Sequence, residues 1–291
     1  MGRVLASIGA TLLFAGSAAS LSVAAFAADL GRPAPAPVYT KAPLAAAQYS
    51  WTGLYAGGQA GYGWSPDDVN TAANGIGQQP PSPGAIADAA AFGLHFPTAP
   101  KGFLGGGTLG YNIQTGQFVW GVETDLSWAD IKGTSSQGAT VPVAVIPGIF
   151  GTTAGVAQQK IDAFGTLRAR LGFTPVDRLL VYGTGGLAYG HVESNTNIAE
   201  THNELGISLT NAVGSASSWR GGWTAGAGLE YAFAPRWTAK AEYLYYDLGS
   251  ISYNSSSTTL LFGVPLFATG VTSTADFKGN IVRGGINYKF Q

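Results

Sequence analysis

The sequence contains no cysteine, which excludes disulfides, thiolate nucleophiles and cysteine-ligated metal sites. Charged residues are also scarce: they make up 11% of the 291 residues, against about 25% in ordinary soluble domains. The formal net charge is −1, so no basic field exists that would attract nucleic acid. After position 30 no run of about 20 consecutive apolar residues occurs, which argues against a transmembrane helix in the mature chain.

The first 27 residues show the three parts of a secretory signal peptide. Arg3 supplies the positive charge, residues 4–23 form an apolar, Ala-rich run, and Ala25-Phe26-Ala27 is a small-x-small cleavage site. An uncleaved membrane anchor is the alternative, and the cleavage triplet with the acidic residue behind it disfavours that reading. We therefore expect cleavage after Ala27 and export of the chain. Residues 28–49 are rich in Pro and Ala, which predicts an extended periplasmic tether.

From residue 50 to the end, apolar and polar residues alternate with a period of two, which is typical of strands with one apolar face. Eight runs show this alternation: 51–64, 103–114, 117–130, 160–173, 179–193, 222–233, 236–248 and 280–290. In the last run Val282, Ile286 and Phe290 share one face and Arg283 lies on the other. In the run 160–173 the same rule places Ile161 on the apolar face and Asp162 on the polar face.

The connections between these runs alternate in length. Short turns are expected at Thr115-Gly116, 174–177 and Ala234-Pro235, and long loops at about 65–102, 131–157, 194–216 and 250–275. A soluble barrel, with its apolar faces inward, gives no reason for this grouping of long loops. A barrel in a membrane has short periplasmic turns and longer external loops. The sequence thus predicts an all-β, transmembrane, eight-stranded antiparallel up-and-down β-barrel over residues 50–291.

In such a barrel the apolar faces contact lipid and the polar faces line the interior. Large aromatic residues stand near the strand ends and are predicted to form two interfacial girdles: Trp64, Trp120, Trp128, Phe173, Trp223, Phe233, Trp237, Tyr288 and Phe290. Charged residues of both signs stand in the middle of the polar faces and are predicted to pair inside: Glu123, Asp125, Arg168, Arg170, Glu230, Lys240, Glu242 and Arg283. The sequence indicates which face of its strand each charged residue occupies, but not which residues pair with one another.

Several motifs together resemble the alphaproteobacterial outer-membrane immunogenic proteins, within the opacity/OmpA-like barrels. They are the mature start ADL with its Pro-rich tether, WTGLYAGGQAGYGW, TGQFVWGVETDLSWADIKG, FGTLRARLGF, LLVYGTGGLAYG, GWTAGAGLEYAFAPRWTAKAEYLYYDLG and VRGGINYKF. The resemblance covers all eight runs and not the long loops. It implies a monomeric barrel in the bacterial outer membrane, surrounded by lipid and assembled by the barrel-insertion machinery. Gln291 after Phe290 departs from the terminal aromatic that this family uses as an insertion signal.

The leading functional hypothesis is a structural role in envelope integrity with a surface-exposed antigenic face. The alternatives are a narrow passive pore, if the interior charges are unpaired, and loop-mediated adhesion or ligand binding. An eight-stranded barrel has just enough room for its own side chains, which favours a filled interior. The only histidines, His95, His191 and His202, stand on or next to predicted loops and in no catalytic or zinc-binding motif. We therefore expect no enzyme activity, no metal and no cofactor.

The apolar stretch TTLLFGVPLFATGV, residues 258–271, is interpreted as a hairpin that extends the strands, turning at about residues 263–265.

Overall fold

The computed structural model describes residues 48–77, 89–142, 150–202, 207–209 and 211–290. The chain divides into two compact units, Met1–Ala46 and Ala47–Gln291, and all described residues belong to the second. The predicted signal peptide and most of the predicted tether lie outside the described residues. Within the described ranges, no helix is long and apolar enough to cross a membrane.

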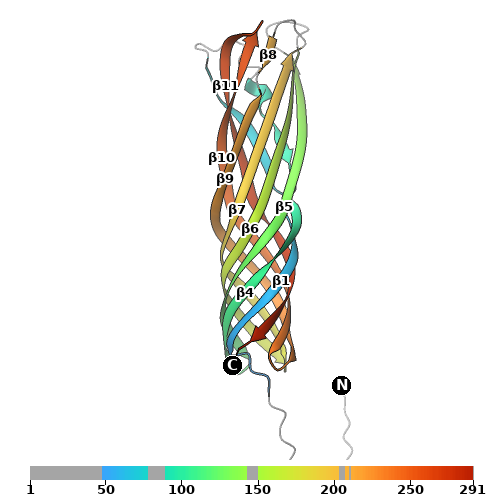
Figure 1. The fold of residues 1–291 in the computed structure, drawn as a ribbon, viewed down its shortest axis with the longest axis vertical. Helices are drawn as coiled ribbons and strands as arrows, with labels where there is room; N and C mark the ends of the chain where they lie inside the picture. Colours follow the sequence, from blue (N-terminus) through green and yellow to red (C-terminus); the bar gives the residue numbers. More distant parts are fainter. Residues whose placement is uncertain (1–47, 78–88, 143–149, 203–206, 210, 291) are drawn as a thin grey trace, which may run out of the picture. The chain divides into compact units, whose positions relative to one another are not determined.

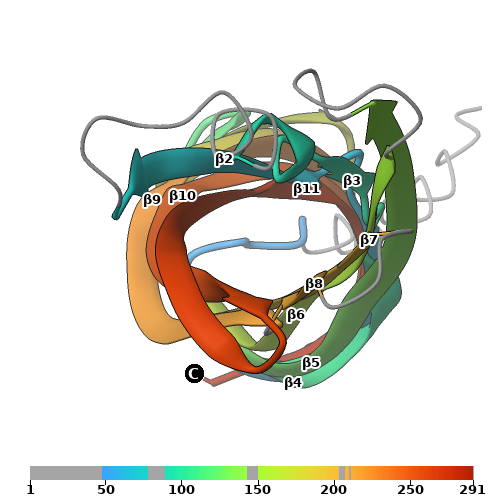
Figure 2. The same cartoon turned by 90° about the horizontal axis from the view of Figure 1, so that it is seen from above.

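Eight long strands close into one antiparallel ring (Figures 1 and 2). Each strand pairs with the next, and the last strand pairs with the first, so that the ring has no free edge along this part of the wall. The strands are β1 (Gly53–Trp64), β4 (Lys101–Thr115), β5 (Phe118–Pro142), β6 (Phe150–Val176), β7 (Leu179–His202), β9 (Ala212–Ala234), β10 (Trp237–Leu261) and β11 (Val264–Lys289). The predicted fold class is confirmed.

The predicted long loops are largely wrong, because the strands continue through most of them. β5, β6, β7, β9, β10 and β11 have 23 to 27 residues each. Three short strands extend the wall further: β2 (Asp68–Ile76) pairs with β11, β3 (His95–Pro97) with β2, and β8 (Ile207–Leu209) with β10. The hairpin interpretation of residues 258–271 is confirmed, although the turn lies at Phe262-Gly263, where φ is positive at both residues.

A β-bulge in β6 reverses the facing that period two predicts for two residues. The pairing of β6 with β7 shifts register between Ile161 and Ala163. As a result Ile161 is buried inside the barrel, and the prediction that it faces outward is wrong; Asp162 correspondingly lies on the outer face beside His191. One extra residue in a strand moves every side chain beyond it to the opposite face.

Two apolar layers lie inside the barrel, one on each side of the predicted charged positions. At the end with the short turns, Trp51 packs against Val119, Leu180, Tyr182 and Ala232. On the other side, a larger cluster fills the interior; its largest fully buried members are Phe92, Phe96, Ile131, Ile161, Phe164, Ile198, Leu244, Tyr246 and Phe277. Phe92 and Phe96 come from the connection between β2 and β4, so this connection contributes to the core and not only to the surface.

Beyond Trp223, on the side away from the short turn at residues 234–237, β9 separates from β10. In the described residues the ladder between these strands ends at the pair Asp247–Trp223, and Arg220 Nη2 then donates to the Ser250 carbonyl oxygen at 2.6 Å across the gap. Gly222 faces inward at this branch, where an added Cβ atom would overlap the Asp247 carbonyl oxygen. Gly221 faces outward, with nothing within 4 Å of the same added atom. Of these two glycines, therefore, only Gly222 stands where a side chain has no room.

We predict that Gly222→Ala lowers the free energy of unfolding by about 1–3 kcal/mol, because the methyl group has no room beside the backbone of β10. Gly221→Ala is the matched control and should be neutral or slightly stabilising. Urea unfolding of the refolded barrel, followed by heat-modifiable gel migration, measures both. Equal stability of the two variants would contradict the close approach at Gly222.

Candidate functional site

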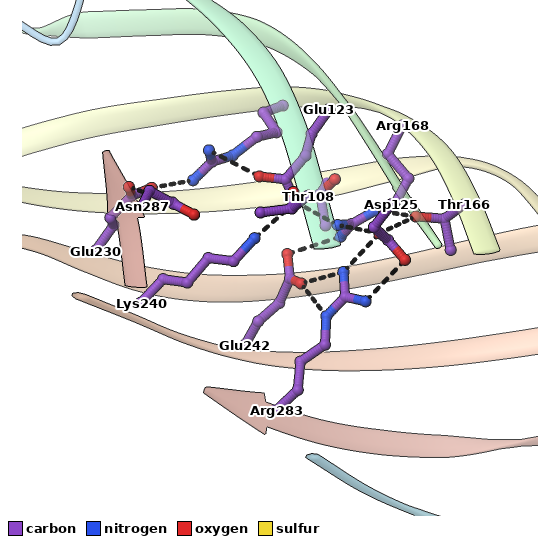
Figure 3. A network of polar contacts seen from close by, with 12 residues as sticks. Thr108, Glu123, Asp125, Thr166, Arg168, Glu230, Lys240, Glu242, Arg283 and Asn287 are labelled. Carbon is purple, nitrogen blue, oxygen red and sulfur yellow. Dashed lines mark hydrogen bonds and ion pairs between the residues drawn. The ribbon is translucent and has the colours of Figure 1, made fainter. Parts of the chain in front are cut away.

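Eight charged side chains form one layer across the barrel interior, and Figure 3 shows their contacts. They come from five strands: Glu123 and Asp125 on β5, Arg168 and Arg170 on β6, Glu230 on β9, Lys240 and Glu242 on β10, and Arg283 on β11. Six of these side chains have an exposed fraction of 0%, and Arg170 and Glu230 reach only 2% and 3%. The layer is therefore shielded from bulk solvent. The structure thus brings together all eight residues that the sequence placed on the inner face.

Glu123 lies at the centre of the layer and accepts hydrogen bonds from three cations. Its Oε1 atom is 2.6 Å from Arg168 Nη2 and 2.9 Å from Lys240 Nζ. Its Oε2 atom is 3.3 Å from Arg170 Nη1 and also accepts a hydrogen bond from the Tyr55 hydroxyl at 2.7 Å. One carboxylate therefore joins β5 to three other strands of the ring.

Arg283 joins the second half of the layer. It forms a two-pronged contact with Asp125, with Nη1–Oδ1 at 3.1 Å and Nη2–Oδ2 at 2.9 Å. Its Nε and Nη2 atoms also lie 2.8 and 2.7 Å from Glu242 Oε2. Arg168 Nη1 holds the other oxygen of Glu242 at 2.7 Å. Bidentate contacts of this kind fix geometry as well as charge.

Two tyrosines with no predicted role, Tyr55 and Tyr182, complete the layer. Arg170 Nη2 is 2.7 Å from Glu230 Oε2, its Nη1 donates to the Tyr55 hydroxyl oxygen at 2.6 Å, and its guanidinium lies 3.8 Å from the centre of the Tyr182 ring. Tyr182 stands one position after Val181, which lies on the apolar face, so strict period two places Tyr182 inside. Tyr55 alternates with Leu54 and Ala56, so strict period two could have placed it inside as well.

The layer contains four carboxylates and four cations, so its formal charges cancel. Desolvating an ion costs several kcal/mol, and only close, well-oriented partners offset that cost. Removing one member leaves its partners charged and buried, which is the more expensive state. The arrangement ties five strands of the ring together; in the described part of the barrel it offers no free charge to a passing ion.

The predicted girdle residues all point away from the interior. They form two rows, one near the short turns and one distant from them. Near the short turns, the ring of Tyr288 lies between those of Trp237 and Phe290, with ring centres 5.0 and 5.2 Å away. Trp120, Phe173 and Phe233 are also exposed and stand within a few residues of the strand ends at the short turns. The opposite row contains Trp64, Trp128 and Trp223, whose side chains are 39%, 81% and 51% exposed.

The histidines have partners that the sequence did not indicate. His95 Nδ1 lies 2.8 Å from Asn70 Oδ1 and 3.5 Å from Asp68 Oδ2. His191 Nδ1 lies 2.8 Å from Asp162 Oδ1, and its Nε2 lies 3.1 Å from Ser217 Oγ. The side chain of His202 lies outside the described residues. Because these partners come from different strands, no local motif could have found them.

Comparison with known proteins gives one consistent family. Residues 36–290 match the family described as outer membrane protein beta-barrel domain. A 31 kDa outer-membrane immunogenic protein of Brucella melitensis is 35% identical over 286 residues, covering 96% of this chain and 99% of that protein. A 25 kDa outer-membrane immunogenic protein of the same species is 30% identical over 272 residues, covering 92% of each chain.

Among solved structures, the outer membrane protein OprG of Pseudomonas aeruginosa aligns with 82% of this chain and 97% of its own, at 16% identity and a TM-score of 0.40.

We predict that Lys240→Met lowers the free energy of unfolding by about 3–5 kcal/mol, because it leaves Glu123 with one cation fewer in a buried site. The double variant Glu123→Gln with Lys240→Met restores neutrality. It should therefore be less destabilised than the sum of the two single variants, with a coupling of about 1–3 kcal/mol.

Asp130→Asn is the control for these variants, since the Asp130–Lys132 pair is exposed by more than half on both sides. Its effect should stay within about 0.5 kcal/mol. Urea titration of the barrel refolded into lipid vesicles measures all four variants. Strict additivity of the Glu123 and Lys240 changes would show that the layer is not coupled.

Proposed function

The chain belongs to the outer-membrane immunogenic proteins of alphaproteobacteria, a family of outer membrane β-barrels, and from this premise we propose a structural role for it. It is a protein of the bacterial outer membrane. Its proposed function is to strengthen the envelope as a closed barrel and to present an antigenic surface to the exterior. The observation that carries this proposal is the neutral, fully desolvated charged layer across the interior.

A closed interior supports a structural role over a pore. A passive channel needs a continuous aqueous path, whereas eight strands leave an interior just wide enough for side chains. Here the charged layer is backed on both sides by apolar clusters, centred on Trp51 at one end and on Phe164 and Tyr246 at the other. An ion would have to break paired charges and then cross an apolar layer, both at high cost.

The strand extensions support the antigenic part of the proposal. The band between the two aromatic rows matches the lipid-facing part of an outer-membrane barrel, and the short turns then face the periplasm. β10 continues from Leu248 to Leu261 beyond the row that contains Trp223, and its hairpin with β11 carries exposed Phe262 and Val264. A stiff wall that projects from the membrane presents a fixed surface to antibodies.

Assembly is proposed to follow the route of other barrels of this kind. The terminal strand β11 ends near Phe290, whose ring contacts Tyr288 in the row near the periplasm. We expect the barrel-insertion machinery to recognise this strand and the folded barrel to stay monomeric in outer-membrane lipid.

Deletion of the gene should increase sensitivity to detergents and to large, apolar antibiotics, because the membrane loses a stiff component. Uptake of small hydrophilic solutes should stay unchanged. Complementation with wild-type protein should restore resistance, and so should complementation with the neutral double variant Glu123→Gln, Lys240→Met at equal surface level. Antibody binding to intact cells reports that level.

The opposite pattern would contradict a structural role. A strain with normal detergent resistance but slower uptake of small solutes would identify the protein as a pore. In that case the double variant, which changes the interior charges, should alter the uptake of charged solutes relative to neutral ones.

A further inference from the structure

A cluster of ligand-type side chains lies on the outer face of the barrel, away from the interior layer. Asp162 on β6 and His191 and Glu193 on β7 each bring one ligand atom into a group whose members lie within 4.8 Å of one another. All three side chains are partly exposed. His191 pairs with Ala163, and Ala163 pairs with Trp128, so the cluster lies at the level of the aromatic row distant from the short turns.

The backbone explains why these three residues meet. His191 and Glu193 are two positions apart in β7 and therefore point to the same face. Asp162 would face inward in a regular strand, but the bulge between Ile161 and Ala163 turns it outward beside them. The imidazole of His191 is held in place from both ring nitrogens, by Asp162 Oδ1 at 2.8 Å and Ser217 Oγ at 3.1 Å.

We propose that Asp162, His191 and Glu193 bind one divalent transition-metal cation, with Zn²⁺ as the ion that this ligand set suits best. Imidazole nitrogen and carboxylate oxygen atoms are both zinc ligands, and a set of three protein ligands leaves a fourth coordination position open to water. The imidazole selects against Mg²⁺ and Ca²⁺, which prefer oxygen ligands alone. Lys160 Nζ, 3.4 Å from Asp162 Oδ2, is the cation that Zn²⁺ would displace; its side chain is 42% exposed and can turn into solvent.

The hydrogen bonds Ser217–His191–Asp162 also have the order of a serine hydrolase triad. Two observations favour a metal site over a catalytic triad. Glu193 adds a second carboxylate that a triad does not use and a cation site does. The ladder between β7 and β9 continues through Glu193–Ser217 and His191–Trp219 without a register shift. Ser217 therefore stands on a regular strand and not on a turn that collects backbone N–H groups around an oxyanion.

The test is titration of the tag-free, refolded full chain with Zn²⁺ against a chromophoric chelator, with folding verified by heat-modifiable gel migration. We expect one equivalent of Zn²⁺ to bind, and an excess of Mg²⁺ or Ca²⁺ not to displace it. His191→Ala should weaken binding about tenfold or more, since even loss of a supporting partner of a ligand costs about 10–100-fold. Glu193→Gln, at a partly exposed position, is a second variant: it removes the carboxylate ligand and keeps the shape of the side chain, so it should also weaken Zn²⁺ binding.

His95→Ala is the matched control, because His95 also lies near a carboxylate, Asp68, but outside the cluster. It should bind Zn²⁺ as the wild type does. The proposal is overturned if the wild type takes up no stoichiometric Zn²⁺, or if His95→Ala loses as much affinity as His191→Ala. Covalent labelling of Ser217 by a fluorophosphonate probe would also overturn it, in favour of a nucleophilic serine.

Discussion

Charges can be buried inside this barrel only because they neutralise one another, and this constraint organises the molecule. Each of the four carboxylates touches at least one of the four cations, and the contacts run between strands that are distant in sequence. Glu123 and Lys240 are 117 residues apart. The pairing therefore ties the ring together from within, while the aromatic rows face outward from the same strands. A barrel wall in lipid must satisfy its backbone polar groups internally, and here the ion pairs between strands neutralise the buried side-chain charges.

Apolar layers on both sides of the charged layer also close the interior. Trp51 and its neighbours lie at the end with the short turns, and the cluster around Phe164 and Tyr246 lies on the other side of the charges. Beyond that cluster the strands continue, and β9 leaves β10 where Gly222 passes the Asp247 carbonyl oxygen. The wall thus changes from a closed, lipid-facing ring to a projecting structure with a different strand arrangement.

Sequence reasoning succeeded where the alternation is strict and failed where a local feature changed its parity. Period two placed Glu123, Arg168 and Arg283 inside, since every second residue of a strand shares a face. It misplaced Ile161 because one inserted residue is invisible in an alternating pattern. The Ser- and Thr-rich strand extensions resembled loops in composition, although their backbones pair. The burial of Phe92 and Phe96, and the contact of His191 with Ser217, depend on strands that only the folded chain brings together.

Single-channel recording in a planar bilayer tests the closed interior most directly. The full chain, refolded in detergent and verified by heat-modifiable migration, should produce no conductance steps, because paired charges and apolar layers occupy the lumen. Stable, reproducible steps would contradict the account. They would show that the buried charges separate in the membrane and that ions pass among Glu123, Arg168 and Arg283.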